Sequence, residues 1–288
     1  MAEFPPVFVE ETCDMRMSEE ELLERNPWRN FVLDILYSTD VEHYVADADK
    51  RMVDAFNRKL PAGDPNRLVL NVPPEPWQGN PLRAKVIFLS LNPGYVPEVN
   101  CKLARLLQSN AEVMRRMVQF KEETLRLESH SFFPDTNHET PVGSKDAICM
   151  LGDWYWERGL RELRESVCGK TYTEAQFYED VAIMQYHAYS SVKCQRKFPP
   201  SGTFLPSQIY TRDLIEHICQ TRPGTLFVIM RSKNEWEKLL SANDLWNRIT
   251  KVIKDNKGMC QAISRKNLLA ENGDDQFETI REKLLERT

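Results

Sequence analysis

Four short apolar runs after residue 84, separated by segments with helical spacing, constrain the fold of this chain most. The first run, AKVIFLSL (84–91), is almost continuously apolar, as a parallel strand covered on both faces requires. The alternation predicts an α/β class fold, namely a three-layer α/β/α domain with a mainly parallel four-stranded sheet. The other expected strands are 181–187, 224–230 and 258–264, and the expected helices are 98–127, 147–167, 206–221, 232–241 and 275–286.

The segment before this alternation has a different pattern. SEEELLERN opens with a serine suited to cap a helix and with early acids, and DVEHYVADADKRMVDAFNRKL continues with helical spacing. The helical pattern stops at Pro61 and Gly63, and RLVLNV (67–72) is a short strand candidate. We therefore predict an N-terminal helical extension, residues 1–60, packed on an α/β domain of residues 61–288.

Charge and cysteine content limit the function classes. The chain has a net charge of −5. Residues 1–26 have a net charge of −6, so the rest of the chain has a net charge of +1. Residues 181–233 hold seven bases against two acids, so a local basic face is one reading and scattered surface charge is the other. The seven cysteines form no C-x-x-C pair, and no apolar run is long enough to span a bilayer. We expect a cytoplasmic protein without membrane contact, and the acidic N-terminus as a possible docking surface for a protein partner.

Polar residues follow the first strand, where ligands bind in parallel α/β sheets. Pro93 fixes φ and keeps Asn92 extended, so that Asn92 projects an amide with donor and acceptor into the cleft. Gly94 permits a positive φ or the close approach of a ligand, and Tyr95 offers a ring for stacking. An ordinary turn that caps a strand is the alternative reading.

The later strand ends add further candidates. Arg231 and Lys233 stand where a helix begins, with Ser232 as its expected N-cap, and helix N-termini with cations suit anions such as phosphate. A plain capped helix start is the alternative. The second strand is followed by Tyr186, His187, Tyr189, Ser190 and Lys193, and the fourth by Arg265, Lys266 and Asn267.

We expect neither a metal nor a cofactor. The five histidines lack metal-ligand spacing, although His130, Asp135 and His138 share one loop and form the only candidate metal set. The chain contains no G-x-G-x-x-G, G-x-S-x-G or H-E-x-x-H motif.

The strand that ends in LNPG, with PEPWQGNP just upstream, resembles the uracil-DNA glycosylase superfamily. In its mismatch-specific and single-strand-selective branches the first motif has the form Gly-(Ile/Met)-Asn-Pro-Gly, and here it reads Ser90-Leu91-Asn92-Pro93-Gly94. The resemblance covers residues 70–270. It implies a protein that flips a base out of nucleic acid and cleaves its N-glycosidic bond.

Under this resemblance Asn92 would hold the attacking water, Tyr95 would stack on the base, and Arg231 with Ser232 would replace the second motif. We thus predict Asn92, His187 and Arg231 as catalytic residues, without a cofactor. A catalytically inactive module that binds a nucleobase, nucleotide or nucleic acid on the same fold is the alternative, and an unrelated α/β hydrolase is another. The predicted substrate-binding residues are Pro93, Gly94, Tyr95, Tyr186, Tyr189, Ser190, Ser232 and Lys233.

Overall fold

The computed structural model describes most of the predicted α/β region and part of the N-terminal extension. The described residues are 17–33, 44–95, 97, 105, 109, 111–128, 159–193, 198–199, 203–254, 262–268 and 275–286. The acidic residues 1–16, the predicted long loop 129–146 and the candidate metal set within it lie outside these ranges.

A five-stranded mixed sheet forms the centre of the fold, with strand order β1-β3-β2-β4-β5. Four strands are parallel: β2 (Val86–Ser90), β3 (Val181–Gln185), β4 (Leu226–Ile229) and β5 (Thr250–Ile253). The strand β1 (Trp77–Gln78) pairs antiparallel with β3 at the edge. The α/β class and the parallel core are therefore confirmed, whereas the predicted number of strands was wrong by one.

Two strand predictions need correction. The fourth parallel strand is β5, not residues 258–264, because 262–264 are not in a strand and 258–261 lie outside the described residues. Residues 67–72 also form no strand, and only Val69 makes an isolated bridge, to Ser190. No sequence pattern marked β5 and β1, because both are short edge strands, which lack the continuous apolar run of a central strand.

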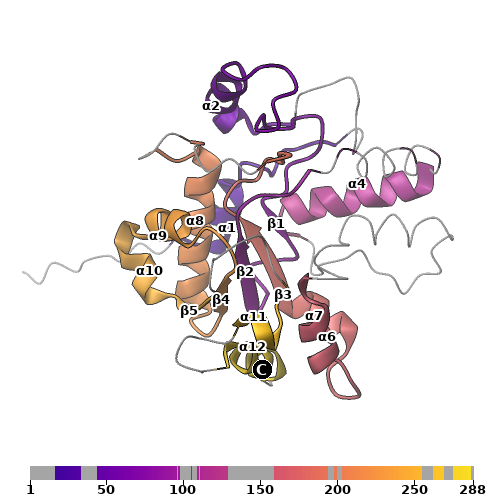
Figure 1. The fold of residues 1–288 in the computed structure, drawn as a ribbon, viewed down its shortest axis with the longest axis vertical. Coiled ribbons are helices and arrows are strands. Elements are labelled where there is room, and N and C mark those ends of the chain that lie inside the picture. The colour runs from indigo at the N-terminus through magenta and orange to yellow at the C-terminus, as the bar shows by residue number, and fades with distance from the viewer. Residues whose placement is uncertain are drawn as a thin grey trace, which may run out of the picture.

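Helices cover both faces of the sheet (Figure 1). Alternate side chains of β2 point to opposite faces: Ile87 and Leu89 join one apolar cluster, and Val86 and Phe88 join the other. The first cluster includes α8 (Pro206–Thr221), α9 (Lys233–Leu240) and α10 (Leu245–Arg248). The second includes α6 (Arg161–Val167), α7 (Glu174–Asp180), α11 (Arg265–Leu268) and α12 (Gln276–Leu285).

The described N-terminal residues pack on the first of these faces. Leu22 of α1 (Glu19–Glu24) and Val53 of α2 (Asp47–Asn57) are fully buried in the same apolar cluster as β2. Ser18 caps α1 through a capping box, as its sequence predicts. Arg25 also forms a 3.0 Å ion pair with Asp213 of α8. The domain boundary at residue 60 stays a prediction.

Three side chains hold the C-terminal end of α4 (Ala111–Leu125), the described part of the predicted helix 98–127. The indole of Trp77 donates to the Thr124 carbonyl at 2.6 Å, and the amides of Asn26 and Asn80 donate to the carbonyls of Leu125 and Leu127. Because the last carbonyls of a helix have no partner within it, these bonds fix where α4 ends. The PEPWQGNP segment thus has a structural task beside β3. None of the helices described here is both long and apolar enough to cross a bilayer.

Candidate functional site

The carboxyl ends of β2, β3 and β4 meet where the sequence predicts a site. The parallel ladder continues past the strands, since the amides of Tyr186 and His187 donate to the carbonyls of Ser90 and Leu91 at 3.1 and 2.8 Å. On the other side, the Met230 amide donates to the Leu89 carbonyl at 2.9 Å. The chain leaves β2 for β3 on one side and returns to β4 on the other, which is the topological switch point that binds ligands in such sheets.

The half-buried Asn92 amide has a defined orientation at this point. Its Nδ2 donates to the Pro93 carbonyl at 3.0 Å and to Ser191 Oγ at 3.2 Å. The Pro93 carbonyl only accepts, so it identifies the nitrogen of the amide. Both Nδ2 hydrogens are used, and among the described residues none donates to Oδ1. Asn92 therefore presents a hydrogen-bond acceptor.

The other residues of the Asn-Pro-Gly-Tyr turn are held beside the segment after β3. Pro93 is buried, and Gly94 forms a parallel bridge with Ser191, to which the Tyr95 amide also bonds at 3.2 Å. Gly94 does not have a positive φ, which removes that reason for a glycine here. A Cβ on Gly94 would meet nothing within 4 Å, so no protein atom requires a glycine at this position.

A cluster of rings lies against the end of β2. Trp236 of α9 donates its indole N–H to the Ser90 carbonyl at 2.8 Å and meets Tyr186 edge to face at 5.5 Å. The Tyr186 ring in turn lies 4.7 Å from the imidazole of His187, which stacks on Phe198 at 6.2 Å. These contacts place aromatic surface from the segment after β3 and from α9 at the same strand end.

Gln208 sets the proton on His187. Its Oε1 accepts from the Leu205 amide at 2.9 Å, so its nitrogen is the atom that bonds the Tyr186 carbonyl at 2.9 Å and His187 Nδ1 at 3.3 Å. Since this nitrogen only donates, Nδ1 accepts in this contact, which corresponds to the tautomer with the ring proton on Nε2. His187 is buried, and in this tautomer it can act as an N–H donor but not as a base through Nδ1.

Charged residues surround the start of α9. Arg231 and Lys233 are half-buried, and no described residue makes an ion pair or hydrogen bond with either charged group. Ser232 stands at the N-cap position as expected, but its φ of 57° is left-handed and its side chain makes no cap hydrogen bond, so the expected capping role was wrong. The α9 helix also brings Glu235 toward the phenol from β3: burial first, and then the charge of Glu235, raise the pKa of Tyr186 to about 12.

Two predicted binding residues have other partners. The Tyr189 hydroxyl donates to Asp49 at 2.7 Å, and the ring is fully buried against Trp28. Asp49 also accepts from the Ser207 amide at 3.0 Å, so it links α2 to the start of α8. The Ser190 carbonyl accepts from the Val69 amide at 2.8 Å. Tyr189 therefore belongs to the core beneath the site, and Ser190 joins two loops.

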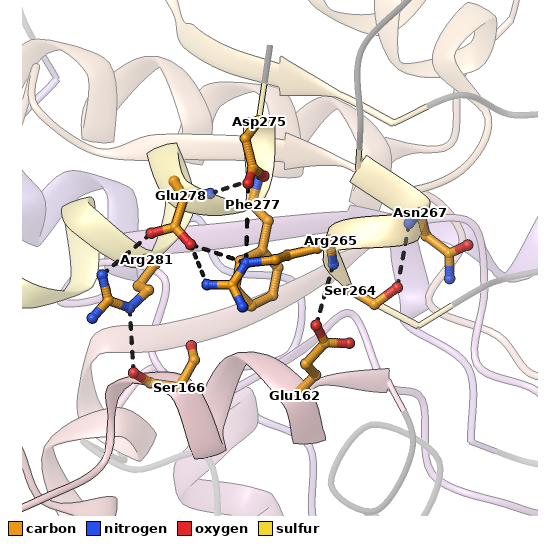
Figure 2. Close-up of polar contacts among 9 residues, drawn as sticks. All are labelled: Glu162, Ser166, Ser264, Arg265, Asn267, Asp275, Phe277, Glu278 and Arg281. Carbon is orange, nitrogen blue, oxygen red and sulfur yellow. Dashed lines mark hydrogen bonds and ion pairs between the residues drawn. The ribbon is translucent and has the colours of Figure 1, made fainter. Parts of the chain in front are cut away.

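The predicted fourth strand end is a structural contact rather than a free cluster of cations (Figure 2). Arg265 lies over the Phe277 ring at 5.0 Å and bonds Glu278 of α12, and this guanidinium lowers the pKa of that carboxyl. Asn267 donates to the Ala262 carbonyl at 3.2 Å, while Lys266 is exposed. These contacts attach α11 to α12, and they leave Arg265 and Asn267 out of the site.

The five bases of residues 181–233 that the structure describes do not gather on one face. Arg222 donates to the carbonyls of Leu82 and Ala84, before β2 begins, which is the opposite end of the sheet from Asn92. Arg212 forms an ion pair with its neighbour Asp213. Only Lys193, Arg231 and Lys233 follow the carboxyl ends of strands, while Arg196 and Lys197 lie outside the described residues.

Sequence reasoning missed several members of this site, namely Ser191, Gln208, Glu235 and Trp236. Each lies far along the chain from its partner, as Ser191 does from Asn92, so no local pattern marks it. The signal that could have pointed to them is the predicted parallel sheet, since its strands end at one edge and the residues after β2, β3 and β4 therefore lie together. Within the ranges given above, no three His, Cys, Asp or Glu residues gather as a metal site would need.

Comparison with known proteins adds no relative to this picture. No protein-family model, no curated protein and no solved structure matches the chain.

Proposed function

We propose that this chain is a glycosylase-like protein, which cleaves the N-glycosidic bond of a flipped base in nucleic acid or in a nucleotide. The observation that carries the proposal is the oriented Asn92 amide, whose Oδ1 is an acceptor at the switch point between β2 and β4. The Asn-Pro-Gly turn that resembles the uracil-DNA glycosylase superfamily lies at this point, at the end of the central strand. We propose the same superfamily for the fold.

The reaction needs a water and a place for two opposite charges. As the bond from C1′ to the base nitrogen breaks, its electron pair leaves with the base and positive charge develops on the sugar. Asn92 Oδ1 accepts a hydrogen bond from the water that attacks C1′, and the proton released from that water passes to the departed base. Arg231 stabilises the negative charge on the leaving base. Asn92 is neutral and takes no proton, so this mechanism depends on positioning rather than on a general base.

Aromatic residues near the strand ends supply the surface that holds a base. Tyr95 is half-buried and reachable, whereas Tyr186 and His187 are buried at 7% and 3% exposure. We assign base stacking to Tyr95, and support of the pocket wall to Tyr186, His187 and Trp236. Gly94 and Pro93 form the turn that a substrate approaches, and Lys233 attracts its anionic groups.

A glycosylase assay with enzyme in excess over substrate tests the proposal. The substrates are single- and double-stranded oligonucleotides that carry uracil, mismatched thymine, hypoxanthine or an oxidised pyrimidine. We expect an abasic product from the wild type, none from Asn92→Ala, and wild-type product from Asn66→Ala. Asn66 is a matched control because it is a half-buried asparagine whose amide bonds Asp64 within its own turn and not a predicted site residue. No product from folded protein with any substrate would refute cleavage of these bases.

Binding without cleavage is the second candidate, and one observation favours it. No described residue hydrogen-bonded to Asn92 is a carboxylate, so the site provides no strong base next to the proposed water. Fluorescence anisotropy with the same oligonucleotides separates the two candidates. A binder retains the oligonucleotide intact, and Asn92→Ala weakens its affinity without changing any product.

A further inference from the structure

Ser191 connects the Asn92 amide to the backbone after β3. Its hydroxyl accepts from Asn92 Nδ2 at 3.2 Å and donates to the Lys193 carbonyl at 2.7 Å. Ser191 is buried, with 2% of its surface exposed. A single hydroxyl thus links a proposed catalytic side chain to a fixed peptide group.

The Lys193 carbonyl decides which group donates in each of these two bonds. The Lys193 carbonyl can only accept, so it takes the one hydroxyl proton of Ser191, and the lone pairs of Oγ then have to accept from Asn92. If the Asn92 amide turned over, its oxygen would face two acceptors, the Pro93 carbonyl and Ser191 Oγ. Acceptors that face one another without a donor are costly, so the two bonds together favour the observed orientation over the turned-over amide.

The backbone on both sides holds Ser191 where this bond requires it. Gly94 and Ser191 pair in a parallel bridge, and the Tyr95 amide bonds the Ser191 carbonyl at 3.2 Å. Further along, the Lys193 amide bonds the Pro65 carbonyl at 2.8 Å. Loss of the Ser191 hydroxyl therefore removes one of the two bonds that orient the Asn92 amide and leaves the bond to the Pro93 carbonyl, while the backbone of both segments keeps its own contacts.

We propose that Ser191 is a positioning residue, which fixes the Asn92 amide with its oxygen toward the substrate side and thereby restricts Asn92 to accepting a hydrogen bond. This inference rests on the proposed function, because Asn92 Oδ1 is the atom that would hold the water. It also defines the chemistry that Asn92 accepts: an O–H or N–H group bonds to it, whereas a bare carbonyl does not.

Single-turnover kinetics of Ser191→Ala test the proposal. We expect the rate constant to fall about tenfold, which is the size of one lost hydrogen bond, with substrate affinity unchanged within about twofold. Ser166→Ala is the matched control, because the Ser166 hydroxyl also donates to a backbone carbonyl at 2.7 Å, but on α6. It should retain the wild-type rate.

A second background separates positioning from a purely structural role. Asn92→Asp carries two acceptor oxygens, so its side chain has no wrong orientation for Ser191 to prevent. One of these oxygens faces the Pro93 carbonyl whatever residue stands at position 191, so only rates within the Asn92→Asp background are compared. Adding Ser191→Ala to Asn92→Asp should therefore change the rate less than about twofold. An equal tenfold loss in both backgrounds would show that Ser191 acts only on the structure, and the inference would be overturned.

The amide itself gives a readout that needs no turnover. In NMR spectra of the full chain, the Asn92 side-chain amide is the signal missing from Asn92→Ala. We expect Ser191→Ala to shift one of its two protons upfield and to speed its exchange with water, and an unchanged signal overturns the inference. If Asn92→Ala is inactive and Ser191→Ala has the wild-type rate, positioning is wrong while the proposed function stands. If no substrate is cleaved, the proposed function fails and the NMR result alone decides the orientation.

Discussion

Replacement of the buried Asp49 is the sharpest test of how the region beneath the site is held. Asp49 has no exposed surface and accepts two bonds, from the Tyr189 hydroxyl at 2.7 Å and the Ser207 amide at 3.0 Å. Asp49→Ala leaves both donors buried without a partner. At ~1–3 kcal/mol for each buried donor left unpaired, we expect a loss of about 2–6 kcal/mol in the free energy of unfolding.

The same carboxyl gives a pH dependence whose sign follows from its burial. Burial is the largest effect and raises the pKa of Asp49, although its bonds to Ser207 and Tyr189 act in the opposite direction. The folded state then binds more protons than the unfolded state at pH values between the unfolded and the folded pKa. The stabilisation from Asp49 is therefore fully present below the unfolded pKa and is lost as the pH rises through the folded pKa.

Urea unfolding of the wild type and Asp49→Asn from pH 4 to pH 8 measures this effect. The free energy of unfolding of the wild type minus that of Asp49→Asn should decrease as the pH rises, by at most about 1.4 kcal/mol per pH unit. Asp54→Asn is the control, because Asp54 lies on the same helix with 40% of its side chain exposed and pairs with Lys50 at the surface. A difference that stays flat or grows with pH would refute the buried carboxyl, and with it the assignment of Tyr189 to the core instead of the site.

Three exchanges that remove or introduce a glycine test the turn geometry, one at the start of β3 and two at the candidate site. Gly79→Ala should cost about 2 kcal/mol or more in urea unfolding, because Gly79 has a φ of 72° and a Cβ would lie 2.6 Å from the Val181 carbonyl oxygen; a change below about 0.5 kcal/mol would contradict this geometry. Gly94→Ala should leave the melting temperature unchanged and lower substrate affinity, because its Cβ meets no protein atom; unchanged affinity would mean that no ligand approaches Gly94. Ser232→Gly should stabilise the chain by up to about 1 kcal/mol in the same unfolding assay, since the left-handed Ser232 makes no cap bond, and destabilisation would disprove that account.

The sequence predicted those strands in which every residue is buried. Every residue of β2 is buried, so its apolar run is continuous and its ends are clear. The edge strand β5 is different: Thr250 is exposed and Lys251 is half-buried, which breaks the apolar run. The strand β1 has only two residues and follows prolines, so its pairing with β3 has no sequence pattern of its own.

The candidate site divides along a similar line. That Asn92 and Arg231 lie at neighbouring strand ends could be predicted, because the carboxyl ends of parallel strands meet at one edge of the sheet. The burial of Tyr189 could not be predicted because its partner Asp49 is 140 residues away, and a tyrosine after a strand gives no sign that it points inward. Ser191 was missed for the same reason, since its neighbour Ser190 looks equivalent in sequence and only the bridge to Gly94 distinguishes the two.

Asn92 and Trp236 reach the end of β2 by different physical means, and this difference bears on how the site responds to change. Backbone pairing between the segments after β2 and β3 sets Asn92, through Gly94 and Ser191. Side-chain packing of α9 sets Trp236, whose indole bonds the Ser90 carbonyl. Because a ladder tolerates side-chain exchange and packing does not, substitutions on α9 should disturb the ring cluster before they disturb the Asn92 amide. The acceptor at Asn92 is therefore the more constant feature, and differences in ligand choice between variants should originate from α9.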